Sequence, residues 1–193
     1  MFRANQLDAD LACVLVIDVQ EKLLPLIGGH ERMTAAMLKL LDGVRVFGLP
    51  VVATEQYVRG LGPTVAPIST RLREAAATVL EKAAFSACGD DTVRQTLSEL
   101  DRPQVILAGI EAHVCVQQTA LDLRAMDYRV FVCADAIGSR GKLDYEQAIQ
   151  RMRQDGVIVT TVESVLFELC NRCDTPRFKA ILEVIKAHPP QEE

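Results

Sequence analysis

The sequence has few of the features that mark membrane, secreted or nucleic-acid-binding proteins. No uninterrupted apolar run approaches the roughly 20 residues needed to cross a bilayer. The formal net charge is -5 and lysine and arginine form no cluster, which argues against a nucleic-acid surface. The first residues contain one arginine and two aspartates in place of a basic patch and an apolar core, so no signal peptide is expected. These absences predict a cytoplasmic protein that binds neither membranes nor nucleic acids.

The chain is also poor in groups that hold metals and cofactors. Its three histidines, His30, His113 and His188, are too far apart in the sequence to form a local metal cluster. Six cysteines without a secretory signal indicate reduced thiols and not a disulfide framework. Cys170 and Cys173 form a C-x-x-C pair, but no second pair completes a zinc site, so we interpret this spacing as chance. Neither a P-loop nor a G-x-G-x-x-G motif follows any expected strand, and we expect no metal and no cofactor.

The length and composition are those of an ordinary folded domain. The chain has 193 residues, of which 49% are hydrophobic and 24% are charged. This length allows a full core but not two comfortable domains, so residues 1–193 are expected to form a single globular domain.

Short apolar runs alternate with amphipathic segments along the chain. Strands are expected at 12–18, 50–54, 78–82, 105–109, 128–136 and 156–162. Helices are expected at 33–47, 71–77, 91–100, 116–123 and 143–154, with two more from 164 and from 176, and glycines and prolines predict a loop over 55–70. This alternation predicts an α/β fold, a three-layer α-β-α sandwich around a doubly wound, six-stranded parallel sheet. The expected strand order is 3-2-1-4-5-6.

Three reactive side chains fall at the expected carboxyl ends of strands. Asp18 ends the first strand, Lys82 ends the third, and Cys115 follows the fourth at the start of a helix. In the predicted strand order they share one rim, where α/β proteins bind ligands. Helix N–H groups and the helix dipole favour a thiolate at Cys115. Alternatively, Cys115 is a small buried hydrophobe, Asp18 caps a strand end and Lys82 forms a surface salt bridge.

These three residues lie in motifs that resemble a known family. The segments IDVQ, EKAAFSA and GIEAHVCV are similar to those of the isochorismatase-like hydrolases, also called cysteine hydrolases, and the similarity runs from about residue 12 to 162. The segment TEQYVRGLGPT further resembles the isochorismatase domain-containing subgroup. The resemblance implies a hydrolase that acts on a small molecule and assembles as a homo-oligomer, a dimer or larger.

The resemblance also implies roles for individual residues. Cys115 would be the nucleophile, Asp18 would take its proton and Lys82 would polarise the pair. The Ile110–Glu111 peptide bond would be cis, and the N–H groups of Glu111 and Cys115 would form an oxyanion hole. A thiol activated in this way should be alkylated before Cys13 and Cys133, which fall within expected strands.

Three further side chains lie next to this rim. Gln20, Tyr57 and Phe85 are candidates for lining the substrate pocket, and each could equally be a packing residue.

One departure from the family pattern bears on the reaction. Nicotinamidases carry an Asp-x-His metal-binding run where this chain has Gln56, Tyr57 and Val58. The resemblance therefore favours a metal-independent cysteine hydrolase that cleaves a C–N bond of a small amide, ureide or carbamoyl compound through a thioester. Two alternatives remain open. One is isochorismatase-type hydrolysis of a vinyl ether, a branch that does without the cysteine, and the other is a non-catalytic binding protein on the same fold.

Overall fold

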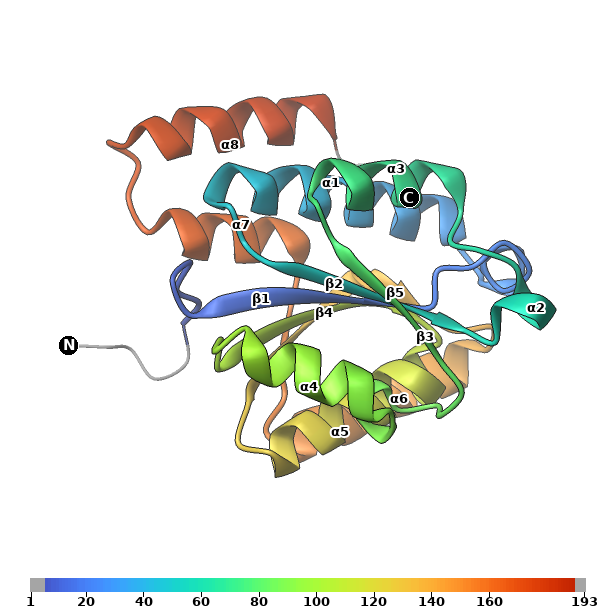
Figure 1. Ribbon diagram of the computed structural model, residues 1–193. Coiled ribbons are helices and arrows are strands. Elements are labelled where there is room, and N and C mark those ends of the chain that lie inside the picture. Colours follow the sequence, from blue (N-terminus) through green and yellow to red (C-terminus); the bar gives the residue numbers. More distant parts are fainter. Residues whose placement is uncertain (1–5, 190–193) are drawn as a thin grey trace.

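The computed structural model describes residues 6–189, which contain a six-stranded parallel sheet between two layers of helices (Figure 1). The strands are β1 (Ala12–Ile17), β2 (Val51–Gln56), β3 (Thr78–Lys82), β4 (Gln104–Ile110), β5 (Arg129–Gly138) and β6 (Ile158–Thr160). Their order, β3-β2-β1-β4-β5-β6, confirms the predicted doubly wound arrangement. All five neighbouring pairs are parallel, so every strand presents its carboxyl end to the same edge.

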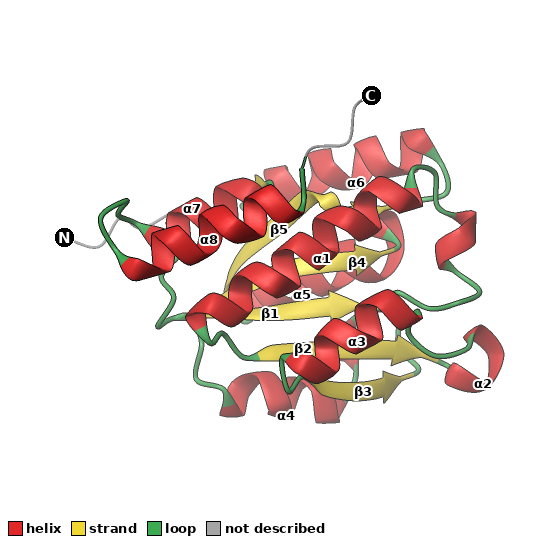
Figure 2. Cartoon of the chain, turned by 90° about the horizontal axis from the view of Figure 1, so that it is seen from above, coloured by secondary structure: helices red, strands yellow, loops and turns green. Residues whose placement is uncertain are grey.

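Helices cover both faces of this sheet. They are α1 (His30–Phe47), α2 (Val58–Leu61), α3 (Ala66–Glu74), α4 (Asp91–Glu99), α5 (Gln117–Ala125), α6 (Lys142–Gln154), α7 (Val162–Cys170) and α8 (Pro176–Ala187). Short turns of other helix types are η1 (Leu24–Leu26), η2 (Ala87–Gly89) and η3 (Ala112–Val116). Figures 1 and 2 place α1, α3, α7 and α8 on one face, and α4, α5 and α6 on the other. Within residues 6–189, no helix has both the length and the apolarity to cross a membrane.

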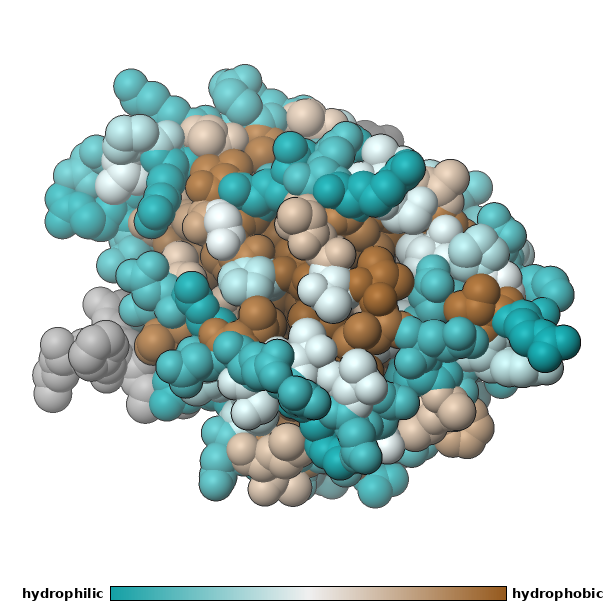
Figure 3. All heavy atoms as spheres, in the orientation of Figure 1, coloured by the Kyte–Doolittle hydropathy of each residue, from teal (hydrophilic) through white to brown (hydrophobic). Residues whose placement is uncertain are grey.

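The alternation of side chains along the central strands builds two cores. In β1, Val14 and Val16 pack into the core beneath α1, while Cys13 and Leu15 pack into the core facing α5. All six residues of β1 and all seven of β4 are buried, because helices cover both faces of these central strands. The edge strand β3 is different. Val79 is 47% exposed, and Figure 3 shows apolar surface on the face where this edge lies.

The predicted loop over 55–70 was wrong in part. Strand β2 continues to Gln56, α2 forms one short turn, and α3 begins at Ala66. Prolines favour a loop when they fall inside a helix, but Pro67 lies in the first turn of α3, where a missing N–H costs nothing. The irregular part of the segment is the stretch around Gly62, between the two helices.

The predicted start of the helix at 164 was also late, and the last strand is shorter than expected. Helix α7 begins at Val162 because the Thr161 side chain caps it, accepting a hydrogen bond from Ser164 N. The Asp135 carboxylate accepts a second bond from Val162 N at 2.9 Å. Helix α8 begins at Pro176, as predicted, and the Thr175 side chain caps it by accepting a hydrogen bond from Phe178 N.

Gly109 of β4 fixes how closely β1 and β4 approach beside the site. Its φ is 125°, and a Cβ atom there would lie 2.1 Å from the backbone oxygen of Ile17. We expect Gly109→Ala to lower the free energy of unfolding by about 3 kcal/mol or more, since both the backbone conformation and a backbone contact forbid the methyl group. Chemical denaturation measures this loss.

Gly48 provides the matched control for that substitution. It also has a positive φ, 68°, but a Cβ atom added there would have no other atom within 4 Å. Gly48→Ala should therefore cost only about 1 kcal/mol, the cost of the conformation alone. Equal losses in the two variants would contradict the assigned role of the β1–β4 contact.

Candidate active site

Asp18 lies at the centre of the sheet's carboxyl edge. It follows β1 directly, and the last residue of that strand, Ile17, pairs with Thr54 of β2 and Gly109 of β4. The backbone turns sharply at Asp18, with φ 51°, and its N–H donates to the Thr54 carbonyl oxygen at 3.1 Å. The side chain is completely buried. The two neighbouring strands therefore fix where this carboxylate lies.

Lys82 reaches Asp18 from the end of β3. Its Nζ lies 2.7 Å from Asp18 Oδ2, and both side chains are inaccessible to solvent. The same ammonium donates to Gln56 Oε1 at 2.5 Å, to the Ala84 carbonyl at 3.0 Å and to the Phe85 carbonyl at 3.1 Å. A buried charge needs an opposite charge and several hydrogen bonds to be tolerated, and Lys82 has both.

The two oxygens of the Asp18 carboxylate differ in their surroundings. Oδ1 accepts a hydrogen bond from Thr54 Oγ1 at 2.8 Å. Oδ2 contacts the Lys82 ammonium but has no well-aligned hydrogen bond among the described residues. Oδ2 is thus the oxygen available to accept a further proton.

Cys115 faces this carboxylate from the neighbouring junction. It lies in η3, a single π-helical turn that leads from β4 into α5, and its side chain is buried with 7% of the residue exposed. Its carbonyl oxygen accepts a bond from Thr119 Oγ1 at 2.6 Å, and Thr119 Oγ1 accepts one from Ala87 N at 2.9 Å. π-helical turns are rare and frequently mark functional sites. The structure thus brings Cys115, Asp18 and Lys82 together.

The expected thiolate at Cys115 is wrong for the resting protein. Burial, and after it the negative charge of Asp18, raises the pKa of the thiol to about 12. The charge of Lys82 and a hydrogen bond from the Glu111 backbone lower the pKa, but by less. The prediction from helix amides failed because the junction encloses the thiol, and desolvation disfavours its charged form. With this pKa, Cys115 is a neutral thiol at neutral pH, beside the Asp18–Lys82 ion pair.

This protonation state predicts an unusual pH dependence of labelling. Iodoacetamide alkylates thiolates, so the rate at Cys115 should rise about tenfold per pH unit through the alkaline range. An ordinary thiol levels off near pH ~8.5. Burial raises the pKa of Cys13 to about 12 as well, so the two thiols do not differ in charge at a given pH. Cys13 should nevertheless be alkylated more slowly than Cys115, because it is completely buried. Peptide mass spectrometry reads each rate, and a Cys115 rate that levels off below pH ~9 would contradict the assignment.

The segment before Cys115 contains Glu111, whose N–H is predicted to contribute to an oxyanion hole. The Ile110–Glu111 peptide bond is cis. The carbonyl oxygen of Glu111 accepts bonds from Val114 N at 3.1 Å and Val116 N at 3.2 Å, which ties Glu111 to η3. The Glu111 N–H faces the thiol of Cys115, since its hydrogen bond lowers the pKa of that thiol. The Glu111 amide is thus a donor that favours the charged form of Cys115.

The three candidate pocket residues lie in two different environments. Gln20 is completely buried, and its amide donates to the Gln56 and Gly62 carbonyl oxygens while accepting from Gln56 N. All of these contacts are to backbone, so Gln20 holds the 56–62 segment. Tyr57 and Phe85 are 61% and 58% exposed. Tyr57 directly follows β2 and Phe85 lies three residues after β3, where both can contact a ligand at the rim.

Two residues of the site were missed from the sequence. Thr54 and Gln56 of β2 provide the hydroxyl that bonds Asp18 and the amide that bonds Lys82. Both lie between β1 and β3 in the sheet, so the predicted strand order could have identified them as the residues separating Asp18 from Lys82.

The described residues offer no group of three histidine, cysteine or acidic side chains placed to hold a metal ion. At the positions that correspond to the nicotinamidase metal run, Gln56 bonds Lys82 and the Ala83 carbonyl, and Tyr57 is exposed. An amide oxygen that already accepts a hydrogen bond from an ammonium group is a poor metal ligand. This donor set does not fit a resident metal.

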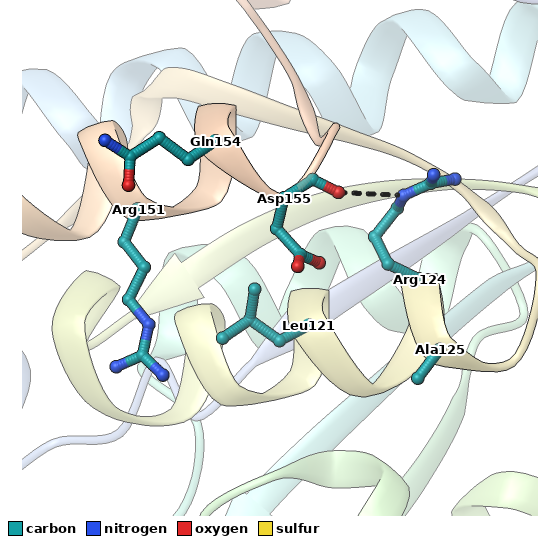
Figure 4. Close-up of a pocket in the computed structure, with 6 residues that line it drawn as sticks. All are labelled: Leu121, Arg124, Ala125, Arg151, Gln154 and Asp155. Carbon is teal, nitrogen blue, oxygen red and sulfur yellow. Dashed lines mark hydrogen bonds between the residues drawn. The ribbon is translucent and has the colours of Figure 1, made fainter.

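A hollow of about 510 Å³ lies elsewhere, between α5 and α6 (Figure 4). Figure 4 shows Arg124 at its edge, where Nε donates to the Asp155 carbonyl oxygen at 3.4 Å. The lining residues belong to the carboxyl-terminal halves of both helices and the turn after α6, whereas Cys115 precedes α5. None of the predicted site residues lines this hollow.

Sequence comparisons give a consistent set of relatives. The isochorismatase domain matches residues 12–164. Isochorismatase domain-containing protein 1 of Salmo salar is 39% identical over 175 residues, which are 90% of this chain and 60% of that protein. The chain thus spans about three-fifths of that relative's length. The secreted isochorismatase effector Isc1 of Phytophthora sojae is 36% identical over 188 residues, 96% of this chain and 90% of the effector.

Solved structures share the whole fold. MAR1 ribonuclease of Caenorhabditis elegans matches with a TM-score of 0.89 and 34% identity, over 97% of this chain and 99% of the other. YcaC of Pseudomonas aeruginosa, solved with hexane-2,5-diol and covalent acrylamide, matches at 0.88 and 28% identity, over 98% and 95%. The Escherichia coli ycaC gene product, an octameric hydrolase of unknown specificity, matches at 0.91 and 25% identity, over 98% and 94%.

Proposed function

Because this chain belongs to the isochorismatase family of hydrolases, we propose that it is a metal-independent cysteine hydrolase that cleaves the C–N bond of a small amide, ureide or carbamoyl compound. The observation that carries the proposal is the buried arrangement of Cys115, Asp18 and Lys82 at the edge where strands end. A neutral thiol needs a base at the moment of attack, and the Asp18 carboxylate is within reach.

The first half-reaction forms a thioester. Asp18 Oδ2 takes the proton of the Cys115 thiol as sulfur attacks the substrate carbonyl carbon, and the carbonyl oxygen becomes an oxyanion. The N–H groups of Glu111 and Cys115 stabilise that charge. The C–N bond then breaks, and the leaving nitrogen takes the proton from Asp18, so that ammonia or an amine departs. The Lys82 ammonium balances the Asp18 carboxylate before it takes the proton and again after it has given the proton up.

The second half-reaction regenerates the thiol. Asp18 takes a proton from water as the water oxygen attacks the thioester carbonyl. The C–S bond breaks, the carboxylic or carbamic acid leaves, and the proton returns to sulfur. The sum is one amide and one water converted to one acid and one amine. No step needs a cofactor, in keeping with the donor set of the site.

Observations on relatives support this chemistry over the alternatives. The Pseudomonas aeruginosa neighbour carries a covalent acrylamide, an unsaturated amide that reacts with nucleophiles such as thiols. Vinyl-ether hydrolysis gives Cys115 no role. The Caenorhabditis elegans neighbour is called a ribonuclease, but the net charge of -5 does not suit a polyanionic substrate. A purely non-catalytic protein would have no need of a buried, fully compensated ion pair beside a thiol.

A substrate screen tests the proposal. Small amides, ureides and carbamoyl compounds are incubated with the purified protein in EDTA, and ammonia release is measured against Cys115→Ala. We expect turnover of at least one compound, unaffected by the chelator and abolished in the variant. Turnover that disappears in EDTA and returns with added metal would contradict the metal-independent mechanism, and turnover that survives in Cys115→Ala would contradict the nucleophile.

We also propose that the chain forms a homo-oligomer. Support comes from the octameric Escherichia coli neighbour and from the exposed apolar side chain of Val79 on the open edge strand. The oligomer size can be read by light scattering.

A further inference from the structure

The loop after β5 makes two contacts with the segment that carries Cys115. This loop, residues 139–141, joins β5 to α6. Ser139 Oγ lies 3.0 Å from His113 Nδ1, and Arg140 Nε lies 3.0 Å from Glu111 Oε2. Both partners belong to the stretch between β4 and Cys115.

The Arg140 contact is more than a surface ion pair. The Glu111 carboxylate is buried, with 9% of its side chain exposed, and it accepts three bonds from one residue. Arg140 Nε donates to Oε1 at 3.2 Å and to Oε2 at 3.0 Å, and the Arg140 backbone N–H donates to Oε2 at 3.1 Å. A carboxylate bound by both a side chain and a backbone amide has little freedom to rotate. The side-chain carboxylate of Glu111 is therefore held in place by Arg140.

The backbone of Glu111 is also held by hydrogen bonds. The Glu111 carbonyl oxygen accepts from Val114 N and Val116 N, and the Glu111 N–H faces the thiol of Cys115. The position of this N–H thus depends on contacts at both ends of the same residue. Nothing else in the described part of the chain hydrogen-bonds the Glu111 side chain.

We infer that Arg140, assisted by the Ser139–His113 contact, is a positioning residue that aims the Glu111 N–H at the reacting carbonyl oxygen. The inference rests on the proposed function for its role in turnover. Arg140 touches neither sulfur nor substrate in this account, and its effect passes through Glu111. Hydrogen-bond donors at an oxyanion act only when they are held in place before the charge develops.

Kinetics of Arg140→Ala test the inference. Removing an oxyanion donor altogether costs about 100- to 1,000-fold in kcat, so misaligning one should cost on the order of 10- to 100-fold, with KM within about twofold. Glu111→Gln, which keeps an acceptor for the Arg140 bonds, should retain more activity than Glu111→Ala. A merely structural ion pair would change stability but would leave kcat unchanged below the unfolding temperature.

A matched control separates the site effect from loss of any arginine. Arg172 is another exposed arginine paired with an acid, Asp174, and lies after α7, away from the site. Arg172→Ala should leave kcat, KM and labelling unchanged.

A second readout needs no turnover. Since the Glu111 N–H stabilises the charged form of Cys115, Arg140→Ala should slow iodoacetamide labelling of Cys115 several-fold at pH ~9, and Arg172→Ala should not. If the wild type turns over no compound while labelling slows in Arg140→Ala, the proposed function fails and the positioning stands. If labelling and kcat both match the wild type in Arg140→Ala, the positioning inference is overturned while the proposed function stands.

Discussion

Asp18→Asn is expected to abolish turnover and, at the same time, to speed the alkylation of Cys115. Loss of a general base costs typically 100- to 10,000-fold, so kcat should fall by about 1,000-fold. The thiol should respond in the opposite sense, because the charge of Asp18 and its contact with sulfur both raise the pKa of Cys115. Without that charge, and with Lys82 still present, more thiolate exists at a given pH. Labelling at pH ~8 should be about tenfold faster, for a pKa lower by about one unit.

The proposed role of Asp18 as proton acceptor, taken alone, would predict slower labelling in this variant, so the direction of the change separates the two effects of the carboxylate. Asp135→Asn is the matched control, since Asp135 is another carboxylate with a pKa that desolvation raises, but it caps α7 and lies outside the site. It should leave both measurements unchanged. A variant Asp18→Asn that labels more slowly, or that retains turnover, would show that Asp18 does not act as the base.

Lys82→Met is expected to cost about 3–5 kcal/mol in the free energy of unfolding, the usual penalty for breaking a buried ion pair from one side. The substitution leaves the Asp18 carboxylate without its counter-charge and leaves the Gln56, Ala84 and Phe85 acceptors without their donor. Turnover should fall on the order of 100-fold, since the charge that balances Asp18 is lost. Labelling of Cys115 should slow, because the Lys82 charge lowers the pKa of the thiol.

Chemical denaturation provides the stability measurement, and Lys186→Met provides its control. Lys186 pairs with Glu183 on the exposed surface of α8, where an ion pair contributes at most about 1 kcal/mol. The double variant of Asp18→Asn and Lys82→Met should be less destabilised than the sum of the single variants, since it buries no uncompensated charge. Additive losses would contradict the coupling of the two charges.

Much of the fold could be predicted because two signals agree along most of the chain. The spacing of apolar residues and the positions of glycine and proline indicate the same helices and strands. The fully apolar runs of β1 and β4 could only be central strands, and the alternation of strands and helices left few topologies. The errors occurred at residues whose type is compatible with two different kinds of secondary structure. Pro67 breaks helices in their interior but starts α3, and Thr161 looks like a strand residue but caps α7.

The site was predictable in its positions and less so in its electrostatics. Strand ends could place Asp18, Lys82 and Cys115 on one rim, since parallel strands end together. Burial could not be read from the same pattern, and burial decides the pKa of the thiol. Arg140 could not be found from the sequence either, because its partner Glu111 lies 29 residues earlier and meets it only through the β4–β5 pairing.

The central claim is that Cys115 carries the acyl group of the substrate during turnover. The most direct test is to quench a single turnover with acid and to measure the intact mass of the protein by mass spectrometry. With the best substrate of the amide screen, the account predicts an increase in intact mass equal to the acyl group less one hydrogen. Peptide mapping should place the adduct on Cys115 alone, and Cys115→Ala should show neither adduct nor product. Product formed by Cys115→Ala at the wild-type rate, or an acyl adduct on another residue, would contradict it.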